Sequence, residues 1–236
     1  EYAIVPERCV YPLPDKMSFV TASLLEPLTI GLQAVRLGRA GPTTRSAVVI
    51  GAGTIGLAII VALKAYGVQR IAAVDLDASR LKEAMEFGAD AVFDATETTA
   101  KQLAEWGTSS ADTDGADLVL EAVGAAASVE TAIHAVTRGG TVVLVGNVSP
   151  AVELPLQTVV TRQIRLQGSC ASAGCYPEAI ELAASGTVDL SRFVSRVAPL
   201  ENGADWFERL HNREPGILKV VLQPSGNIEG EANVTF

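Results

Sequence analysis

The sequence predicts an α/β fold in which six parallel strands form one doubly wound sheet with helices on both faces. From residue 47 onward, short apolar runs alternate with segments of helical periodicity, as expected for repeated βα units with right-handed crossovers. The apolar run 47–50 leads directly into the glycine-rich segment 51–56, and an apolar helical segment follows. Asp75 closes the next apolar run, nineteen residues beyond Gly56.

Each strand of the predicted sheet is an apolar run, and each predicted helix is followed by a glycine or a turn signal that ends it. Gly67, Gly88 and Gly107 follow the first three helical segments, and Arg138-Gly139-Gly140 marks a turn after the fourth. The expected strands are 47–50, 71–74, 91–93, 118–120, 141–145 and 164–166. The expected helices between them are 54–66, 79–87, 98–106 and 125–136.

The flanking segments differ from this alternating region. Residues 1–27 contain four prolines, which favours irregular strands over helices. Helices are expected over 177–185 and 204–210, and a terminal strand over 217–222. The chain opens at Glu1 rather than at methionine, so we expect a fragment or a processed product. The expected domains are a remnant of a second domain (1–27), the sheet domain (28–170), a return to the second domain (171–224) and a mobile polar tail (225–236).

The segment 51–56 has the Gly-x-Gly-x-x-Gly spacing of a dinucleotide-binding loop, in the required order of strand, tight turn, helix, second strand and acid. Gly51 allows the tight turn, Gly53 lets the backbone approach a pyrophosphate, and Gly56 lets the helix pack closely on the strand. Thr54 and Ile55 open the helix, whose N–H groups and dipole favour phosphate. A strand-to-helix turn that merely needs glycines is the alternative interpretation.

Asp75 indicates which dinucleotide binds. A carboxylate at this position accepts hydrogen bonds from the adenosine ribose hydroxyls and repels a 2′-phosphate, which predicts NAD rather than NADP. Arg80 is the nearby cation. It can weaken this preference, lie along the adenine, or be a solvated residue of the next helix.

Composition and charge exclude several classes of partner. The 236 residues carry 18 Lys and Arg against 27 Asp and Glu, without a basic run, so nucleic acid is not an expected partner. No apolar stretch has the length of a membrane span. The three cysteines, Cys9, Cys170 and Cys175, form neither a disulfide framework nor a Cys-x-x-Cys metal motif, so we expect a cytoplasmic protein.

The ordered motifs of the chain resemble the medium-chain, zinc-type alcohol dehydrogenase family, in particular its sorbitol and polyol dehydrogenase branch. The resemblance runs from Tyr2 to about Pro224. It implies a Rossmann cofactor domain together with remnants of a GroES-like β catalytic domain, most of which this chain lacks. The motifs are Glu1-Tyr2-Ala3, Leu25-Glu26-Pro27-Leu28, the glycine-rich loop, Phe87-Gly88-Ala89-Asp90, Glu121-Ala122-Val123-Gly124 and Leu218-Lys219-Val220-Val221.

The resemblance also implies roles for single residues. Strand ends and loops that would hold the nicotinamide and its ribose are Val123, Gly124, Val145, Gly146 and the Ser169-Cys170-Ala171 stretch, with Thr29-Ile30 on the other face of the ring. Glu26 would be a zinc-site carboxylate, and the other family ligands, a cysteine and a His-Glu pair, would lie upstream of Tyr2. His134 and His211 match no such motif, and we interpret them as surface or packing residues. Because Zn²⁺ takes four ligands, we expect these residues alone not to retain zinc.

Three hypotheses follow. The first is an NAD-dependent alcohol or polyol dehydrogenase whose truncated chain is inactive alone. The second is a non-catalytic NAD-binding module or oligomerisation scaffold. The third is a zinc-free reductase of the same superfamily, which has no use for Glu26. The resemblance implies a small alcohol or polyol substrate and a homodimer or homotetramer, in which last strands of two sheets pair.

Overall fold

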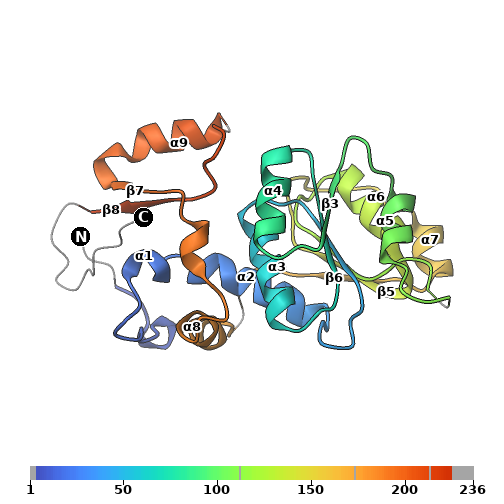
Figure 1. The fold of residues 1–236 in the computed structure, drawn as a ribbon, viewed down its shortest axis with the longest axis horizontal. Helices are drawn as coiled ribbons and strands as arrows, with labels where there is room; N and C mark the ends of the chain where they lie inside the picture. Colours follow the sequence, from blue (N-terminus) through green and yellow to red (C-terminus); the bar gives the residue numbers. More distant parts are fainter. Residues whose placement is uncertain (1–3, 112, 173, 213, 225–236) are drawn as a thin grey trace. The chain divides into compact units, whose positions relative to one another are not determined.

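The computed structural model describes residues 4–111, 113–172, 174–212 and 214–224 (Figure 1). The chain divides into two compact units, which we describe separately. The sheet unit is Pro27–Ala173, and the flanking unit combines Glu1–Glu26 with Gly174–Phe236. The tail predicted over 225–236 lies outside the described residues.

The sheet unit contains a six-stranded sheet with the order β3-β2-β1-β4-β5-β6, and all its neighbouring strands are parallel. The strands are β1 (Ala47–Ile50), β2 (Ile71–Asp75), β3 (Ala91–Asp94), β4 (Ala116–Glu121), β5 (Val136–Leu144) and β6 (Arg165–Gly168). This is the strand order of the doubly wound dinucleotide-binding fold, and it confirms the predicted fold class. The order reverses between β1 and β4, so a crevice for a ligand is expected where their carboxyl ends diverge.

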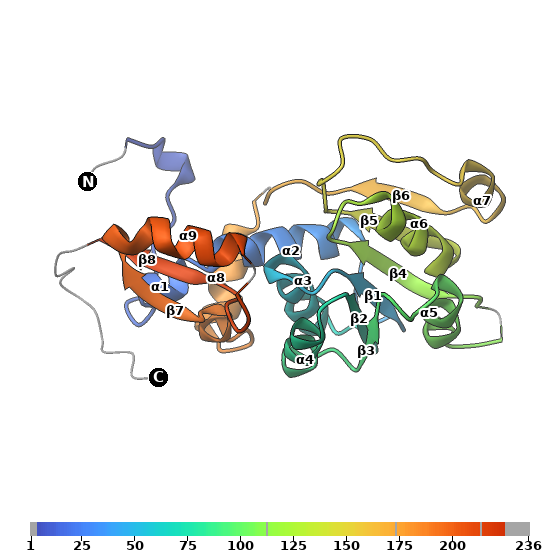
Figure 2. The same ribbon diagram turned by 90° about the horizontal axis from the view of Figure 1, so that it is seen from above.

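Helices cover both faces of this sheet. Leu103 of α5 and Ile133 of α6 pack with Val48, Val119 and other strand residues in one buried cluster. On the other face, α2 and α3 lie side by side, as both views show (Figures 1 and 2). A Cβ at Gly31 of α2 would lie 2.6 Å from the Ala58 backbone of α3, so glycine permits this approach. The helices are α2 (Leu25–Leu37), α3 (Thr54–Ala65), α4 (Ala78–Glu86), α5 (Ala100–Gly107), α6 (Ala126–Ala135) and α7 (Leu156–Thr161).

β5 begins earlier than the sequence predicts. The segment Arg138-Gly139-Gly140, expected as a turn, lies inside the strand. Val136 pairs with Ala116, but the next pair is Thr141 with Leu118, so β5 contains an irregular insertion. Gly139 has φ +72° there, which explains the glycine. A bulge and a turn have the same local residue signature, and only the partner strand distinguishes them.

The flanking unit departs further from expectation. The prediction of irregular strands near the N-terminus is wrong for the described residues 4–24, which contain two short helices, η1 (Glu7–Cys9) and α1 (Phe19–Ala22), and no strand. The Ser18 hydroxyl caps α1 by accepting the Thr21 N–H at 3.1 Å. A strand needs a neighbour to accept its hydrogen bonds, whereas this cap satisfies the helix locally.

The C-terminal part of the flanking unit contains a two-stranded parallel sheet. Its strands and helices are α8 (Tyr176–Ala184), η2 (Leu190–Phe193), β7 (Arg196–Pro199), η3 (Leu200–Asn202), α9 (Gly203–His211) and β8 (Val220–Gln223). The rings of Tyr11 and Tyr176 stack with centroids 5.3 Å apart and tie its two chain segments together. None of the described helices, in either unit, is both long and apolar enough to cross a membrane.

Candidate functional site

The glycine-rich loop joins the carboxyl end of β1 to α3, and its glycines have different structural reasons. Gly51 has φ +95°, in the left-handed region that favours glycine, and its N–H donates to the Val74 carbonyl at 2.7 Å. A Cβ at Gly56 would lie 1.8 Å from the Gly51 carbonyl oxygen, so only glycine lets α3 pack this closely. A Cβ at Gly53 would meet none of the described atoms within 4 Å, and its φ of −74° suits any residue. Neither packing nor conformation requires glycine at position 53.

The N-terminus of α3 opens at this loop. Its N-cap, Gly53, offers no side-chain hydrogen bond, and the first turn contains no acidic residue. Thr54 and Ile55 are half-buried there, while Leu57 and Ile60 are fully buried and anchor the helix. The positive end of the helix dipole faces the loop, and the first turn of α3 itself carries no carboxylate, which favours an anionic ligand.

Asp75, the last residue of β2, places its carboxylate beside the loop. Oδ2 accepts the Ala52 N–H at 2.7 Å and lies 3.8 Å from Nη1 of Arg80. Oδ1 accepts the Asp77 N–H at 3.0 Å, and the side chain is 9% exposed. The Ser79 hydroxyl and N–H donate to Asp77 and lower the pKa of that carboxyl, so a second ionised group stands nearby. Arg80 is paired with Asp75, and the surroundings of the loop are acidic.

The carboxyl ends of β4 and β5 form the other half of the site. Val123 and Gly124 follow β4, and Val145 and Gly146 follow β5. Gly124 has φ +81°, and a Cβ on it would lie 2.4 Å from the Gly146 carbonyl carbon. The two loops therefore touch through their backbones. Val123 also reaches the glycine-rich loop, because a Cβ at Gly51 would lie 2.8 Å from Val123 Cγ2.

Ser169 lies immediately after β6 and is held there by its N–H, which donates to the Leu144 carbonyl at 2.9 Å. Its hydroxyl oxygen is buried and, among the described residues, has no hydrogen-bond partner. Buried hydroxyls are nearly always paired, so this atom lacks an expected partner. Cys170 is exposed, and Ala171 has φ 55°.

The described residues do not offer a metal centre. No group of three or more His, Cys, Asp or Glu among them is arranged to hold a metal ion. Glu26 is exposed in the first turn of α2 and belongs to the flanking unit, while Thr29 is buried on the same helix within the sheet unit. His134 and His211 are exposed at the ends of α6 and α9.

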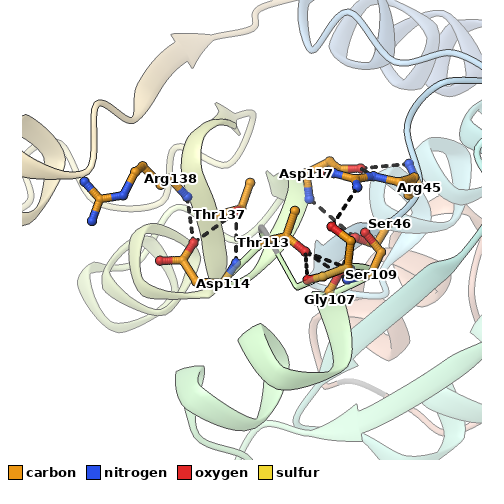
Figure 3. Close-up of polar contacts among 10 residues, drawn as sticks. Arg45, Ser46, Gly107, Ser109, Thr113, Asp114, Asp117, Thr137 and Arg138 are labelled. Carbon is orange, nitrogen blue, oxygen red and sulfur yellow. Dashed lines mark hydrogen bonds and ion pairs between the residues drawn. The ribbon is translucent and has the colours of Figure 1, made fainter.

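At the amino ends of the strands, away from the carboxyl-end site, polar residues pair with one another (Figure 3). Nη2 of Arg45 lies 2.9 Å from Oδ1 of Asp117. Oδ1 of Asp114 accepts the Arg138 N–H at 2.9 Å and the Thr137 hydroxyl at 3.0 Å, and Arg162 lies 3.3 Å from its Oδ2. These contacts, led by the Arg138 N–H, lower the pKa of Asp114. This network joins the amino ends of the strands and serves the fold.

Sequence reasoning assigned no role to one residue at the carboxyl edge, Glu121. Its side chain is fully buried at the end of β4, and its carboxylate accepts N–H groups of the loop that follows. The signal was present in the Glu121-Ala122-Val123-Gly124 motif, but burial and bonding were visible only in three dimensions.

Comparison with known families matches residues 54–185 to the zinc-binding dehydrogenase family. The chain is 35% identical to sorbitol dehydrogenase of Bos taurus over 224 residues, which are 92% of this chain and 60% of the bovine enzyme. The chain therefore belongs to the zinc-binding dehydrogenase family, and the predicted resemblance to its polyol dehydrogenases is confirmed. It spans about 60% of the length of this curated relative.

Solved structures agree with the fold. A short chain alcohol dehydrogenase from E. coli CFT073, complexed with NADH, matches with a TM-score of 0.86 at 24% identity. The match covers 94% of this chain and 64% of that one, and at this identity it speaks for the fold alone. A structure from Sinorhizobium meliloti 1021 bound to NADP matches with a TM-score of 0.78 at 25% identity, over 90% of this chain and 62% of that one.

Proposed function

We propose that the sheet unit binds NAD(H) across the carboxyl edge of its sheet. The observation that carries this proposal is Gly53, where a side chain would meet open space at the start of α3. A glycine that neither packing nor conformation requires is accounted for by a pyrophosphate that approaches the backbone. The Ser169 hydroxyl, which is buried and has no hydrogen-bond partner within the described part of the chain, is a second feature that a bound cofactor would satisfy.

In this proposal each part of the cofactor has its own residues. The pyrophosphate lies on Gly51, Gly53, Thr54, Ile55 and Gly56 at the positive end of α3. The adenosine ribose hydroxyls donate to Asp75, with Arg80 beside the adenine. The nicotinamide half lies along the ends of β4, β5 and β6, at Val123, Gly124, Val145, Gly146 and Ser169.

The proposed cofactor is NAD rather than NADP. Asp75 is beside the loop, and Arg80, the cation that could accept a 2′-phosphate, is 3.8 Å from the Asp75 carboxylate. A 2′-phosphate would approach the carboxyl groups of Asp75 and Asp77 and would compete with Asp75 for Arg80. An NADP-bound relative exists in the family, so this preference depends on these local charges.

The reaction that we propose for this site is oxidation of an alcohol or polyol, by analogy with sorbitol dehydrogenase. The nicotinamide, when bound, accepts a hydride from the carbon that bears the hydroxyl. The chain's own part is to bind the cofactor, hold the ring and separate it from water. Glu26 remains our proposal for one zinc ligand, but one carboxylate does not fit a four-ligand Zn²⁺ site, so we derive no step through the metal.

Self-association is a further part of the proposal. β6 is at the edge of the sheet, where its backbone groups can pair with a copy. Large apolar side chains are exposed just before it, including Leu156 at 68% and Val160 at 64%. A second copy that pairs along β6 would cover part of this surface.

The cofactor assignment is tested with Asp75→Asn. Asparagine keeps an oxygen for the Ala52 N–H, but its NH₂ group replaces Oδ1, which accepts the Asp77 N–H, and it presents an amide to the ribose. We therefore expect NADH binding to weaken by roughly 1.5–3 kcal/mol. The affinity for NADPH should change little, so the difference between the affinities for NADH and NADPH should become smaller. Fluorescence titration of both cofactors measures this.

The matched control is Asp94→Asn, because Asp94 pairs in register with Asp75 on the neighbouring strand of the same edge. It removes a carboxylate charge without touching the loop, and it should leave NADH affinity unchanged. Equal affinity of the unaltered protein for NADH and NADPH, or an equal loss in both variants, would contradict the assignment.

A further inference from the structure

Glu121 is a buried carboxylate at the carboxyl end of β4, with 0% of the residue exposed. Oε1 accepts the N–H groups of Val123 and Gly124, both at 2.8 Å, and Oε2 lies 3.0 Å from the same Gly124 nitrogen. Burying a polar side chain is costly unless hydrogen bonds compensate. Two backbone N–H groups provide that compensation, so the side chain and the loop fix each other.

The main chain of the same residue holds the second loop. The Glu121 carbonyl accepts the Val145 N–H at 2.8 Å and the Gly146 N–H at 3.0 Å. One residue therefore fixes both backbone segments that we assign to the nicotinamide half, one with its side chain and one with its carbonyl. The contact between Gly124 and Gly146 joins the two segments directly.

The glycine-rich loop is linked to this arrangement through Val123. The Glu121 carboxylate fixes the Val123 N–H, and the Val123 side chain lies against Gly51. Val123 is 36% exposed, so part of its side chain remains open to a ligand. A shift of the loop after β4 would thus move the exposed part of Val123, which we assign to the nicotinamide half.

We propose that Glu121 is the positioning residue for the nicotinamide half of the cofactor, acting through the Val123 and Gly124 backbone without touching the cofactor. This inference rests on the proposed function, because it requires that a dinucleotide binds. Asp75 and Ala52, which serve the adenosine half, are hydrogen-bonded to each other, whereas the Glu121 carboxylate bonds to the loop after β4. The two halves of the site are therefore expected to respond differently to a change at Glu121.

The substitution Glu121→Gln tests whether the nicotinamide half of the site responds differently from the adenosine half. With its amide oxygen in place of Oε1, the glutamine can still accept from Val123 and Gly124, but its NH₂ group would then lie against the Gly124 N–H, where Oε2 now accepts. Two donors repel, so the turn must move. We expect NADH to bind about tenfold more weakly, which corresponds to about 1.4 kcal/mol, whereas AMP, which lacks the nicotinamide half, should bind as before.

The experiment is a titration of the whole 236-residue protein with NADH and with AMP, for the unaltered chain, Glu121→Gln and Glu130→Gln. Glu130 is an exposed glutamate on α6, so its variant makes the same chemical change away from the site. Weakened NADH binding with unchanged AMP binding, in Glu121→Gln alone, supports the proposal. An equal loss of both ligands means a merely structural role and overturns it, as does unchanged NADH binding.

A measurement on the unaltered protein covers the case in which Glu121→Gln does not fold. The amide NMR signals of Val123, Gly124, Val145 and Gly146 should shift on addition of NADH and stay in place with AMP. Equal shifts with both ligands, or none with NADH, overturn the positioning role. If the unaltered protein binds neither NADH nor AMP, the proposed function itself fails, and the inference fails with it.

Discussion

Substituting alanine at two glycines of the same loop is predicted to affect two different properties, the stability of the fold at Gly56 and cofactor binding at Gly53. At Gly56 the new Cβ would lie 1.8 Å from the Gly51 carbonyl oxygen. An unstrained carbon–oxygen contact is about 3.3 Å, so backbone must move by roughly 1.5 Å. At Gly53 the new Cβ would meet none of the described atoms within 4 Å. Gly56→Ala should therefore damage the fold, and Gly53→Ala should damage only binding.

The magnitudes follow from these contacts. Overpacking costs about 1–3 kcal/mol, so Gly56→Ala should lower the Tm by about 2–12 °C. For Gly53→Ala, the gain of about 0.4–1 kcal/mol from a stiffer unfolded chain is offset by the preference for glycine over alanine at an N-cap. Its Tm should stay within about 2 °C of the original value. If the pyrophosphate needs the space at Gly53, the same 1–3 kcal/mol appears as about 5- to 150-fold weaker NADH binding.

Thermal unfolding followed by circular dichroism and fluorescence titration with NADH measure the two quantities on each variant. The unaltered protein and Asp94→Asn serve as controls for folding and for NADH affinity. Gly53→Ala with wild-type Tm and wild-type NADH affinity would refute the argument that this glycine is kept for a ligand. Gly56→Ala with an unchanged Tm would refute the packing argument.

Two further predictions concern stability and assembly. The contacts of Asp114 lower its pKa, so their stabilisation is present above the unfolded pKa of about 3.9 and is lost as pH falls through the lower folded value. Asp114→Asn should therefore cost about 1 kcal/mol or less in urea unfolding at pH 7, and the difference from the unaltered protein should shrink below about pH 4. At micromolar concentration the unaltered protein should scatter light as a dimer, and Val160→Asp should shift it towards the monomer without lowering the Tm. A clean 24.6 kDa monomer of the unaltered protein would contradict pairing along β6.

Val160 suits this test because of its exposure to solvent, which the sequence alone does not show. Ile164, just before β6, is an apparent candidate for the same test when only the sequence is known. The structure places it in the buried cluster under α5 and α6, with 7% exposed, so Ile164→Lys would unfold the sheet rather than test its edge. Val160 is 64% exposed on α7, a helix that the sequence pattern did not reveal.

The sequence by itself determined the alternation of strands and helices, the family and the glycine-rich loop, because these depend on residues that are neighbours along the chain. The period of apolar residues defines a strand or a helix, and three glycines at fixed spacing define the loop, whatever the rest of the chain does. Asp75 could also be singled out, since its distance from Gly56 is part of the same pattern.

Only the tertiary structure decided what depends on segments far apart in the sequence. The bulge in β5 depends on its register with β4, and the helices η1 and α1 stand where the prolines predicted irregular strands. The Glu121 carboxylate bonds to the nearby residues Val123 and Gly124, but only the sheet order β1-β4-β5 brings its carbonyl to Val145 and Gly146 and places both loops beside the phosphate loop. Burial and hydrogen bonding are properties of this assembled edge, and no local pattern encodes them.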